Sequence, residues 1–211
     1  MSETTTEKIN KYLYDEAVRK REEHKIEPNV FYPSSCGQCI RKMYFERMTP
    51  KVFPPQMYKY FVIGNLTHEW LQKNIYSDGQ NEVPIKWTEG DIIFSGRVDC
   101  RYPDRVLEFK SIGKLDYVRK KPKDEHVEQL NMYLHAMKIE RGVVIYITKN
   151  ELEVVEHEIL YNPKLYKKTV AKFKRLYWYT SKGVEPKITK CGSPWSCEYC
   201  KKEKETNSKI N

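Results

Sequence analysis

Apolar residues recur at two different spacings along the chain, and each spacing predicts one kind of element. Ile9, Leu13 and Ala17 follow a capping box at residues 4–7, which predicts a helix to about residue 25. The same helical spacing predicts four further helices: one from Pro33 to a break at Pro54 and Pro55, and others over residues 57–76, 123–138 and 163–181.

Shorter apolar runs predict four strands. They cover residues 92–100, 105–112, 142–148 and 153–160. Turn residues separate the first pair and also the second pair, so each pair is expected to form a hairpin. The order is helices, a hairpin, a helix, two strands and a helix, which predicts an α/β or α+β fold in one domain.

Composition adds an expected partner. The 211 residues suit one domain, and 38 basic against 29 acidic residues give a net charge of +9, which favours a polyanion. The 16 tyrosines and 4 tryptophans are available to stack on bases or to fill the core. No apolar run is long enough to cross a bilayer and no secretory signal opens the chain, so we expect a cytoplasmic protein, or one of the host cytoplasm if the chain is viral.

Three charged residues lie on two neighbouring predicted strands. Asp99 lies near the end of one strand, and Glu108 and Lys110 lie on the next. Side chains alternate along a strand, so Glu108 and Lys110 share a face beside Asp99. Carboxylates are suitable ligands for Mg²⁺ or Mn²⁺, and a lysine beside them can stabilise developing negative charge. The group predicts a metal-dependent hydrolytic site, although Glu-x-Lys alone is more typical of a charged surface strand.

Four short motifs then follow the order seen in one nuclease superfamily. They are Gly64-x-x-x-His68-Glu69, Gly96-x-x-Asp99, Glu108-x-Lys110 and Gln129-x-x-x-Tyr133. As an ordered set they resemble the motifs of the PD-(D/E)XK nuclease superfamily and its RecB-like branch, and the resemblance as a whole spans about residues 34–200. The resemblance implies a restriction-endonuclease-like α/β core, in which helices flank a central mixed sheet.

The resemblance also implies a role for each motif residue. His68, Asp99, Glu108 and the Phe109 carbonyl are expected to hold the metal ion, and Lys110 to assist catalysis. Gln129 and Tyr133 lie one helical turn apart on one face, where they can orient Lys110 or contact DNA phosphate. Tyr133 is equally well explained as a core residue, and both roles are compatible.

A basic segment between the motifs is a candidate for contacts with the DNA backbone. A solvated charge run explains it almost as well. The segment contains Arg119, Lys120, Lys121 and Lys123.

The six cysteines favour metal binding over disulfides in a reducing cytosol. Cys197-x-x-Cys200 has the spacing of metal ligands, and Cys191 adds a third thiol. The fourth ligand must come from elsewhere, with Cys39 and Cys36 as the candidates. Cys100 is expected to face away from the hydrolytic site as a small core residue.

The cysteine distribution resembles two Fe–S groups within the RecB-like branch, the CRISPR-associated exonuclease family and the AddB-type helicase–nucleases. That resemblance implies a [4Fe–4S] cluster joining the two ends of the chain. The Cys39-x-Arg41-x-x-Tyr44 segment is similar to the one in those families and favours Cys39. Their C-terminal spacing is Cys-x2-Cys-x5-Cys, whereas the short gap comes last in this chain, so structural Zn²⁺ is the competing assignment.

The implied activity is a Mg²⁺- or Mn²⁺-dependent deoxyribonuclease, with exonuclease action on single-stranded DNA or DNA ends favoured. CRISPR adaptation, recombination and repair, or viral DNA processing are the implied settings, with partner proteins from those systems. A single-strand-specific endonuclease and a non-cleaving DNA-binding adaptor are the alternatives, and RNA cleavage stays open.

We expect one nuclease domain over residues 1–211: N-terminal helices (1–56), a core (57–182), a cysteine loop (183–200) and a disordered tail (201–211).

Overall fold

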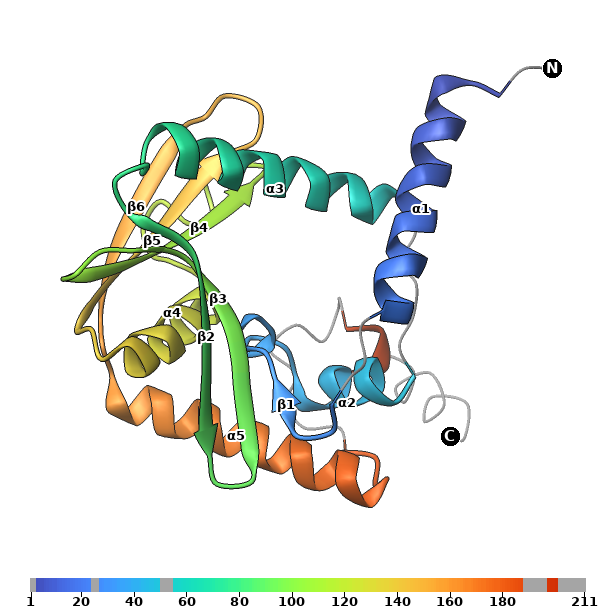
Figure 1. Ribbon diagram of the computed structural model, residues 1–211. Helices are drawn as coiled ribbons and strands as arrows, with labels where there is room; N and C mark the ends of the chain where they lie inside the picture. The colour runs from blue at the N-terminus through green and yellow to red at the C-terminus, as the bar shows by residue number, and fades with distance from the viewer. Residues whose placement is uncertain (1–2, 24–26, 50–54, 188–196, 201–211) are drawn as a thin grey trace, which may run out of the picture.

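The computed structural model describes residues 3–23, 27–49, 55–187 and 197–200 (Figure 1). Within them the helices are α1 (Thr5–Glu23), α2 (Ile40–Met48), α3 (Pro55–Asn74), α4 (Asp124–Met137) and α5 (Pro163–Lys182), with a 3-10 turn at Pro33–Ser35. The strands are β1 (Val30–Phe31), β2 (Gln80–Glu89), β3 (Ile92–Arg101), β4 (Arg105–Ile112), β5 (Arg141–Thr148) and β6 (Val154–Leu160).

The strands form one mixed sheet in the order β1-β3-β4-β5-β6, with β2 paired to β3. The β2–β3, β3–β4 and β5–β6 pairs are antiparallel, whereas β4 and β5 are parallel and are joined through α4. Helices cover both faces of this sheet, which confirms the predicted α/β fold class (Figure 1).

The two faces of β4 pack against different helices. Leu107 and Phe109 belong to a buried cluster with Leu71 of α3. Val106 instead belongs to a cluster with Leu130 and other α4 residues on the opposite face. A third cluster, around Phe31, Phe94 and Phe173, joins α2, α5 and the first part of β3. The core is thus built in three parts, and β4 lies between two of them.

Most predicted elements are confirmed, including all four predicted strands, to within a residue or two. The predicted capping box is also confirmed: the Thr4 amide donates to Glu7 Oε2 at 2.7 Å, and the Glu7 amide donates to Thr4 Oγ1 at 3.3 Å. None of the described helices is both long and apolar enough to cross a membrane.

Two predictions differ from the structure. The second helix was expected from Pro33, but Pro33–Ser35 is a 3-10 turn and the α-helix begins at Ile40. Cys39 caps this helix, because its Sγ accepts the Lys42 amide at 3.4 Å. β2 was not predicted; its side chains alternate between exposed and half-buried, which gives a weak apolar signal. The predicted break at Pro54 and the tail over residues 201–211 lie outside the described residues, apart from Pro55, which begins α3.

Gly142 lets α4 lie close to β5. A Cβ atom at Gly142 would come within 2.8 Å of Leu130 Cδ2, and Leu130 is fully buried. Because Gln129 precedes Leu130 on α4, this close approach also sets the position of the predicted Gln129-x-x-x-Tyr133 motif.

We predict that Gly142→Ala lowers the free energy of unfolding by about 1–3 kcal/mol, because the added methyl group overpacks the α4–β5 contact. Gly113→Ala is the matched control, since a Cβ there meets nothing within 4 Å, and its effect should stay within about 1 kcal/mol. Urea denaturation followed by circular dichroism measures both. Equal stability of the two variants would contradict this account of the α4 position.

Candidate active site and cysteine cluster

The site forms where β3 and β4 separate. The two strands pair near their turn, at Cys100↔Leu107 and Arg101↔Val106. One residue further from the turn, Asp99 Oδ2 accepts the Phe109 amide at 2.7 Å. This hydrogen bond lies on the edge of β4 that faces β3, and it holds the Asp99 side chain between the two strands.

Glu108 and Lys110 share a face of β4, as their spacing predicts. Lys110 Nζ lies 2.7 Å from Glu108 Oε1, and the Glu108 side chain is only 2% exposed. Burying a carboxylate is costly unless it is paired and hydrogen-bonded. The Lys110 ammonium therefore offsets the cost of burying the Glu108 carboxylate through a direct ion pair.

Gln129 on α4 links the two charged groups. Its Nε2 donates to Glu108 Oε1 at 2.7 Å, and its Oε1 accepts from Lys110 Nζ at 3.0 Å. The Tyr133 hydroxyl, one helical turn further, accepts from Gln129 Nε2 at 3.5 Å. Tyr133 also packs in the α4 core cluster, so it is both a core residue and part of the network.

Gly96 explains why a glycine begins the β3 motif. A Cβ atom at Gly96 would come within 3.0 Å of Tyr133 Cε1 and 3.1 Å of the Tyr133 hydroxyl. Gly96 thus leaves room for the tyrosine ring beside Gln129. In the sequence this glycine is recognised only by its resemblance to the nuclease motif, and its packing against Tyr133 supplies the physical reason for it.

His68 reaches the site from α3, on the other side of the sheet. Its Nδ1 lies 3.8 Å from Asp99 Oδ1, and its ring packs edge-on against Phe109. Gly64, one turn earlier, allows this approach, because a Cβ there would lie 3.1 Å from Ser111 Oγ. The structure therefore brings all six predicted side chains together: His68, Asp99, Glu108, Lys110, Gln129 and Tyr133.

Burial controls the charges at this site. It raises the pKa of Glu108 to about 7, with Asp99 adding to the shift, and it raises the pKa of Asp99 to about 6. Burial also lowers the pKa of His68, which favours the neutral imidazole that binds metals. Burial alone would lower the pKa of Lys110, but the Glu108 and Asp99 carboxylates raise it above its ordinary value. The site holds a charged lysine and carboxylates that protonate unusually easily.

One atom of the site fits a bound cation. Glu108 Oε2 is buried and has no hydrogen-bond partner among the described residues. Such an atom is costly unless a ligand or ion satisfies it. It belongs to a carboxylate beside Asp99 and near His68, and this oxygen and nitrogen donor set suits Mg²⁺ or Mn²⁺. The residues present therefore fit the predicted metal.

Gln72 is a neighbour of the site that the sequence reasoning missed. It is largely buried, and its Nε2 donates to the Asp99 carbonyl at 2.9 Å and to Glu82 Oε1 at 2.6 Å. Glu82 has a left-handed backbone (φ 54°) and also accepts from Arg97. Gln72 follows His68 by one helical turn, and that spacing was the available signal.

The predicted basic segment is not part of this network. Three of its residues lie near surface carboxylates: Arg119 is 3.3 Å from Glu153, Lys121 is 3.9 Å from Asp124, and Lys123 is 3.9 Å from Glu125. Such exposed pairs are weak and leave the side chains free to exchange partners. Contact of this segment with DNA stays a prediction.

The cysteines form a second candidate site. The sulfur atoms of Cys39, Cys197 and Cys200 lie within 4.8 Å of one another, and Cys39 Sγ is 3.6 Å from Cys197 Sγ. Burial alone would raise the pKa of Cys197, but hydrogen bonds from Cys200 and Cys39 lower it, which favours the thiolate that binds metal. The donor set fits an Fe–S cluster or Zn²⁺. The predicted ligand Cys191 lies outside the described residues.

The structure separates Cys39 from its alternative, Cys36. Cys36 is fully buried in the core cluster of α2 and α5, and its thiol donates to the Glu125 carbonyl at 3.5 Å. Burial raises the pKa of Cys36 to about 12, which disfavours its thiolate. The predicted core cysteine, Cys100, is fully buried with Phe109.

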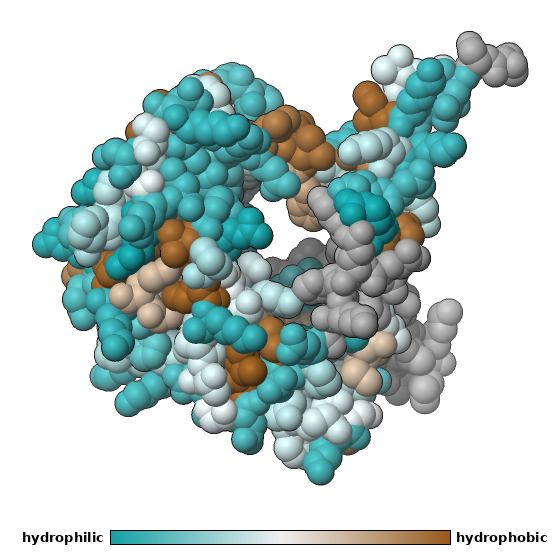
Figure 2. Space-filling model, in the orientation of Figure 1, coloured by the Kyte–Doolittle hydropathy of each residue, from teal (hydrophilic) through white to brown (hydrophobic). Residues whose placement is uncertain are grey.

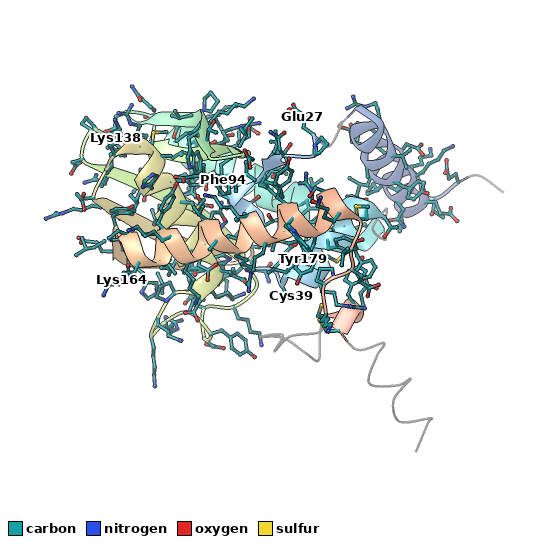
Figure 3. The ribbon with its side chains drawn as sticks, turned by 90° about the horizontal axis from the view of Figure 1, so that it is seen from below. Glu27, Cys39, Phe94, Lys138, Lys164 and Tyr179 are labelled. Carbon is teal, nitrogen blue, oxygen red and sulfur yellow. The ribbon has the colours of Figure 1, made fainter. Side chains whose placement is uncertain are left out.

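The cysteine site joins the start of α2 to the C-terminal residues 197–200. Cys39 lies near the C-terminal end of α5, where Tyr179 is labelled in Figure 3. Arg41 donates to the Tyr199 carbonyl and to the Pro186 carbonyl, both at 2.8 Å. The Phe45 and Tyr199 rings stack with centroids 5.0 Å apart. These contacts hold the C-terminal cysteines against α2 independently of any metal.

Comparison with known proteins supports the resemblance. The chain is 24% identical over 207 residues to the CRISPR-associated exonuclease Cas4 of Saccharolobus solfataricus, covering 91% of this chain and 94% of that protein. No family model matches the chain.

Two solved structures have a similar fold. The crystal structure of SSO0001 has a TM-score of 0.64 and 21% identity, over 92% of this chain and 93% of the other. An alkaline exonuclease from Laribacter hongkongensis has a TM-score of 0.54 and 9% identity, over 95% of this chain and all of the other. The chain thus resembles RecB-like nucleases in sequence and in fold.

We predict that Mn²⁺ affinity falls roughly tenfold between pH 8 and pH 6, since protons compete with the metal for Glu108 and Asp99. The sign follows from their raised pKa values of about 7 and about 6: both carboxylates are largely ionised at pH 8, and Glu108 is largely protonated at pH 6. Isothermal titration calorimetry measures the affinity, with Glu108→Gln expected to bind more weakly at both pH values. An affinity that does not change with pH would contradict the assignment.

We also predict that Cys39→Ser loses most of its bound iron or zinc, whereas Cys36→Ala retains it, because only Cys39 lies beside Cys197 and Cys200. Anaerobic purification followed by elemental analysis and visible absorbance measures both metals. Loss of metal from Cys36→Ala but not from Cys39→Ser would reverse the assignment.

Proposed function

We propose that this chain is a divalent-metal-dependent nuclease that hydrolyses DNA phosphodiester bonds. One observation carries the proposal: Glu108 is buried beside Asp99, Lys110 and Gln129, with one carboxylate oxygen that has no partner among the described residues. The net charge of +9 suits a nucleic acid, and the similarity to an exonuclease over nearly the whole chain supports the same activity.

In this proposal Asp99, Glu108, His68 and the Phe109 carbonyl hold Mg²⁺ or Mn²⁺. When bound, such an ion supplies Lewis-acid chemistry at a phosphoryl oxygen and at the attacking water. The Phe109 amide already points toward Asp99, and the carbonyl of a strand residue points to the same side as its amide. This strand geometry supports the Phe109 carbonyl as a further ligand.

Lys110 supplies positive charge that is already in position. Its Nζ is held by Glu108 Oε1 and Gln129 Oε1, so little reorganisation is needed when negative charge develops on the phosphate. Gln129 acts as a positioning residue, because its amide fixes both Glu108 and Lys110. Tyr133 limits the movement of Gln129 from the same helix.

The segment containing Arg119, Lys120, Lys121 and Lys123 is proposed to contact DNA phosphates.

The finer parts of the proposal follow the similarity to Cas4. We favour exonuclease action on single-stranded DNA or DNA ends, in CRISPR adaptation, recombination and repair, or viral DNA processing, with proteins of those systems as partners. We propose a [4Fe–4S] cluster held by Cys39, Cys197, Cys200 and Cys191, with Zn²⁺ as the competing metal. Residues 1–211 are proposed to form one nuclease domain of the cytoplasm, where thiols stay reduced.

We predict that Asp99→Asn and Lys110→Met each lower kcat for DNA cleavage roughly 100-fold or more, because each removes charge needed at the reacting phosphate. Lys114→Ala is the matched control, because Lys114 is an exposed lysine just beyond the end of β4. This variant should cleave DNA as the wild type does. Thermal unfolding confirms that each variant is folded. If both variants are folded and cleave DNA normally, the proposed active site is refuted.

The same assay tests the competing functions. It uses single- and double-stranded DNA and RNA, in linear and circular forms, with Mg²⁺ and with Mn²⁺. Cleavage of circles would show an endonuclease, and DNA binding without cleavage under any condition would favour a non-cleaving adaptor. Release of nucleotides from linear DNA only is the result that the proposal expects.

A further inference from the structure

Several large apolar side chains near the candidate active site are exposed to solvent. In the N-terminal half of α3, Tyr60 is 60% exposed and Phe61 is 50% exposed, and Val62, Ile63 and Leu66 are also exposed. Figure 2 shows hydrophobic side chains gathered over this half of the helix, beside an opening beneath it. Exposed apolar groups of this size often mark a binding surface.

The two aromatic residues of this set, Tyr60 and Phe61, lie about one turn before the part of α3 that reaches the site. Phe61, Gly64 and His68 are spaced at three and four residues, so they share one side of the helix. Gly64 lies against Ser111, which follows Lys110, and His68 lies beside Asp99. The surface at Tyr60 and Phe61 is therefore continuous with the candidate active site.

A lysine completes this surface. Lys149 Nζ lies 5.2 Å from the centre of the Tyr60 ring and donates to the Tyr60 carbonyl at 3.1 Å. The Lys149 amide in turn donates to the Ile112 carbonyl at 3.1 Å, which ties the lysine to the end of β4. The ammonium and the Tyr60 ring are thus held together beside the strand that carries Glu108 and Lys110, and Phe61, whose ring packs edge-on against Tyr58, is the next residue of α3.

We propose that Tyr60, Phe61 and Lys149 form a subsite for an unpaired nucleotide of a single-stranded DNA substrate. The proposal rests on the proposed nuclease function and adds the residues that would select its single-stranded substrate. Aromatic rings stack on the exposed face of any unpaired base, and an ammonium attracts the adjoining phosphate. Bases inside a duplex are already stacked on both faces, so the subsite discriminates in favour of single strands and frayed ends.

The apolar composition alone would also suit a protein partner or a second copy of this chain. Two observations favour nucleic acid: the lysine is held over an aromatic ring, and the surface leads directly to a site suited to phosphodiesters. The outer side of α3, around Leu66, shares neither feature among the described contacts and serves as the internal control.

The experiment compares the full-length chain with the double variant Tyr60→Ala/Phe61→Ala and with Leu66→Ala. Fluorescence anisotropy in EDTA measures binding to a labelled single-stranded oligothymidine and to a duplex of the same length. The double variant should bind the single strand about tenfold more weakly, with a smaller change for the duplex. Leu66→Ala should bind as the wild type does. Because these rings are exposed, their removal opens no core cavity, and thermal unfolding checks this.

Two results would overturn the subsite. One is equal single-strand affinity for the wild type and the double variant. The other is a changed oligomeric state of the double variant, by light scattering, with unchanged DNA affinity, which would identify a protein interface. Hydrolysis of bis(p-nitrophenyl) phosphate by the wild type with Mn²⁺ tests the nuclease chemistry separately, because this diester has no base to stack. A wild type inactive on it and on DNA would refute the proposed function, while the metal-free binding data would still decide the subsite.

Discussion

The buried carboxylate of Glu108 is the constraint around which the site is built. A charge at 2% exposure is stable only with close partners, and Lys110 and Gln129 both bond to its Oε1. Gln129 can do so only because α4 lies close to β5 at Gly142, and Tyr133 fits beside it only because residue 96 is glycine. The second oxygen, Oε2, is buried and has no hydrogen-bond partner among the described residues. This is the strongest indication of a cation site.

The same constraint explains why the site draws on three layers of the fold. Glu108 and Lys110 face α4, whereas His68 comes from α3 on the other side of the sheet. The two sides meet where β3 and β4 separate, since Asp99 there accepts a backbone amide in place of strand pairing. The cysteine group is not among the side chains bonded in this network and holds α2 against the C-terminal segment, which favours a structural role for any metal bound there.

The sequence predicted which side chains lie together better than it predicted some of the elements around them. Alternation on β4 placed Glu108 and Lys110 on one face, and the four-residue spacing on α4 placed Gln129 and Tyr133 on one face. His68 was identified only by the resemblance to the nuclease motifs. β2 was not predicted, because its side chains are alternately exposed and half-buried. The start of α2 was predicted too early, because Pro33 begins a 3-10 turn. The choice of Cys39 over Cys36, and the part played by Gln72, depend on tertiary packing that spacing alone does not encode.

Glu108, Asp99 and His68 are expected to hold one divalent cation together. The most direct measurement is an anomalous difference map from crystals of the chain grown with MnCl₂. We expect a peak at about 2.1 Å from Glu108 Oε2 and from an Asp99 oxygen, with His68 turned toward it. A chain that cleaves DNA with Mn²⁺ but shows its manganese away from Glu108 would contradict the account.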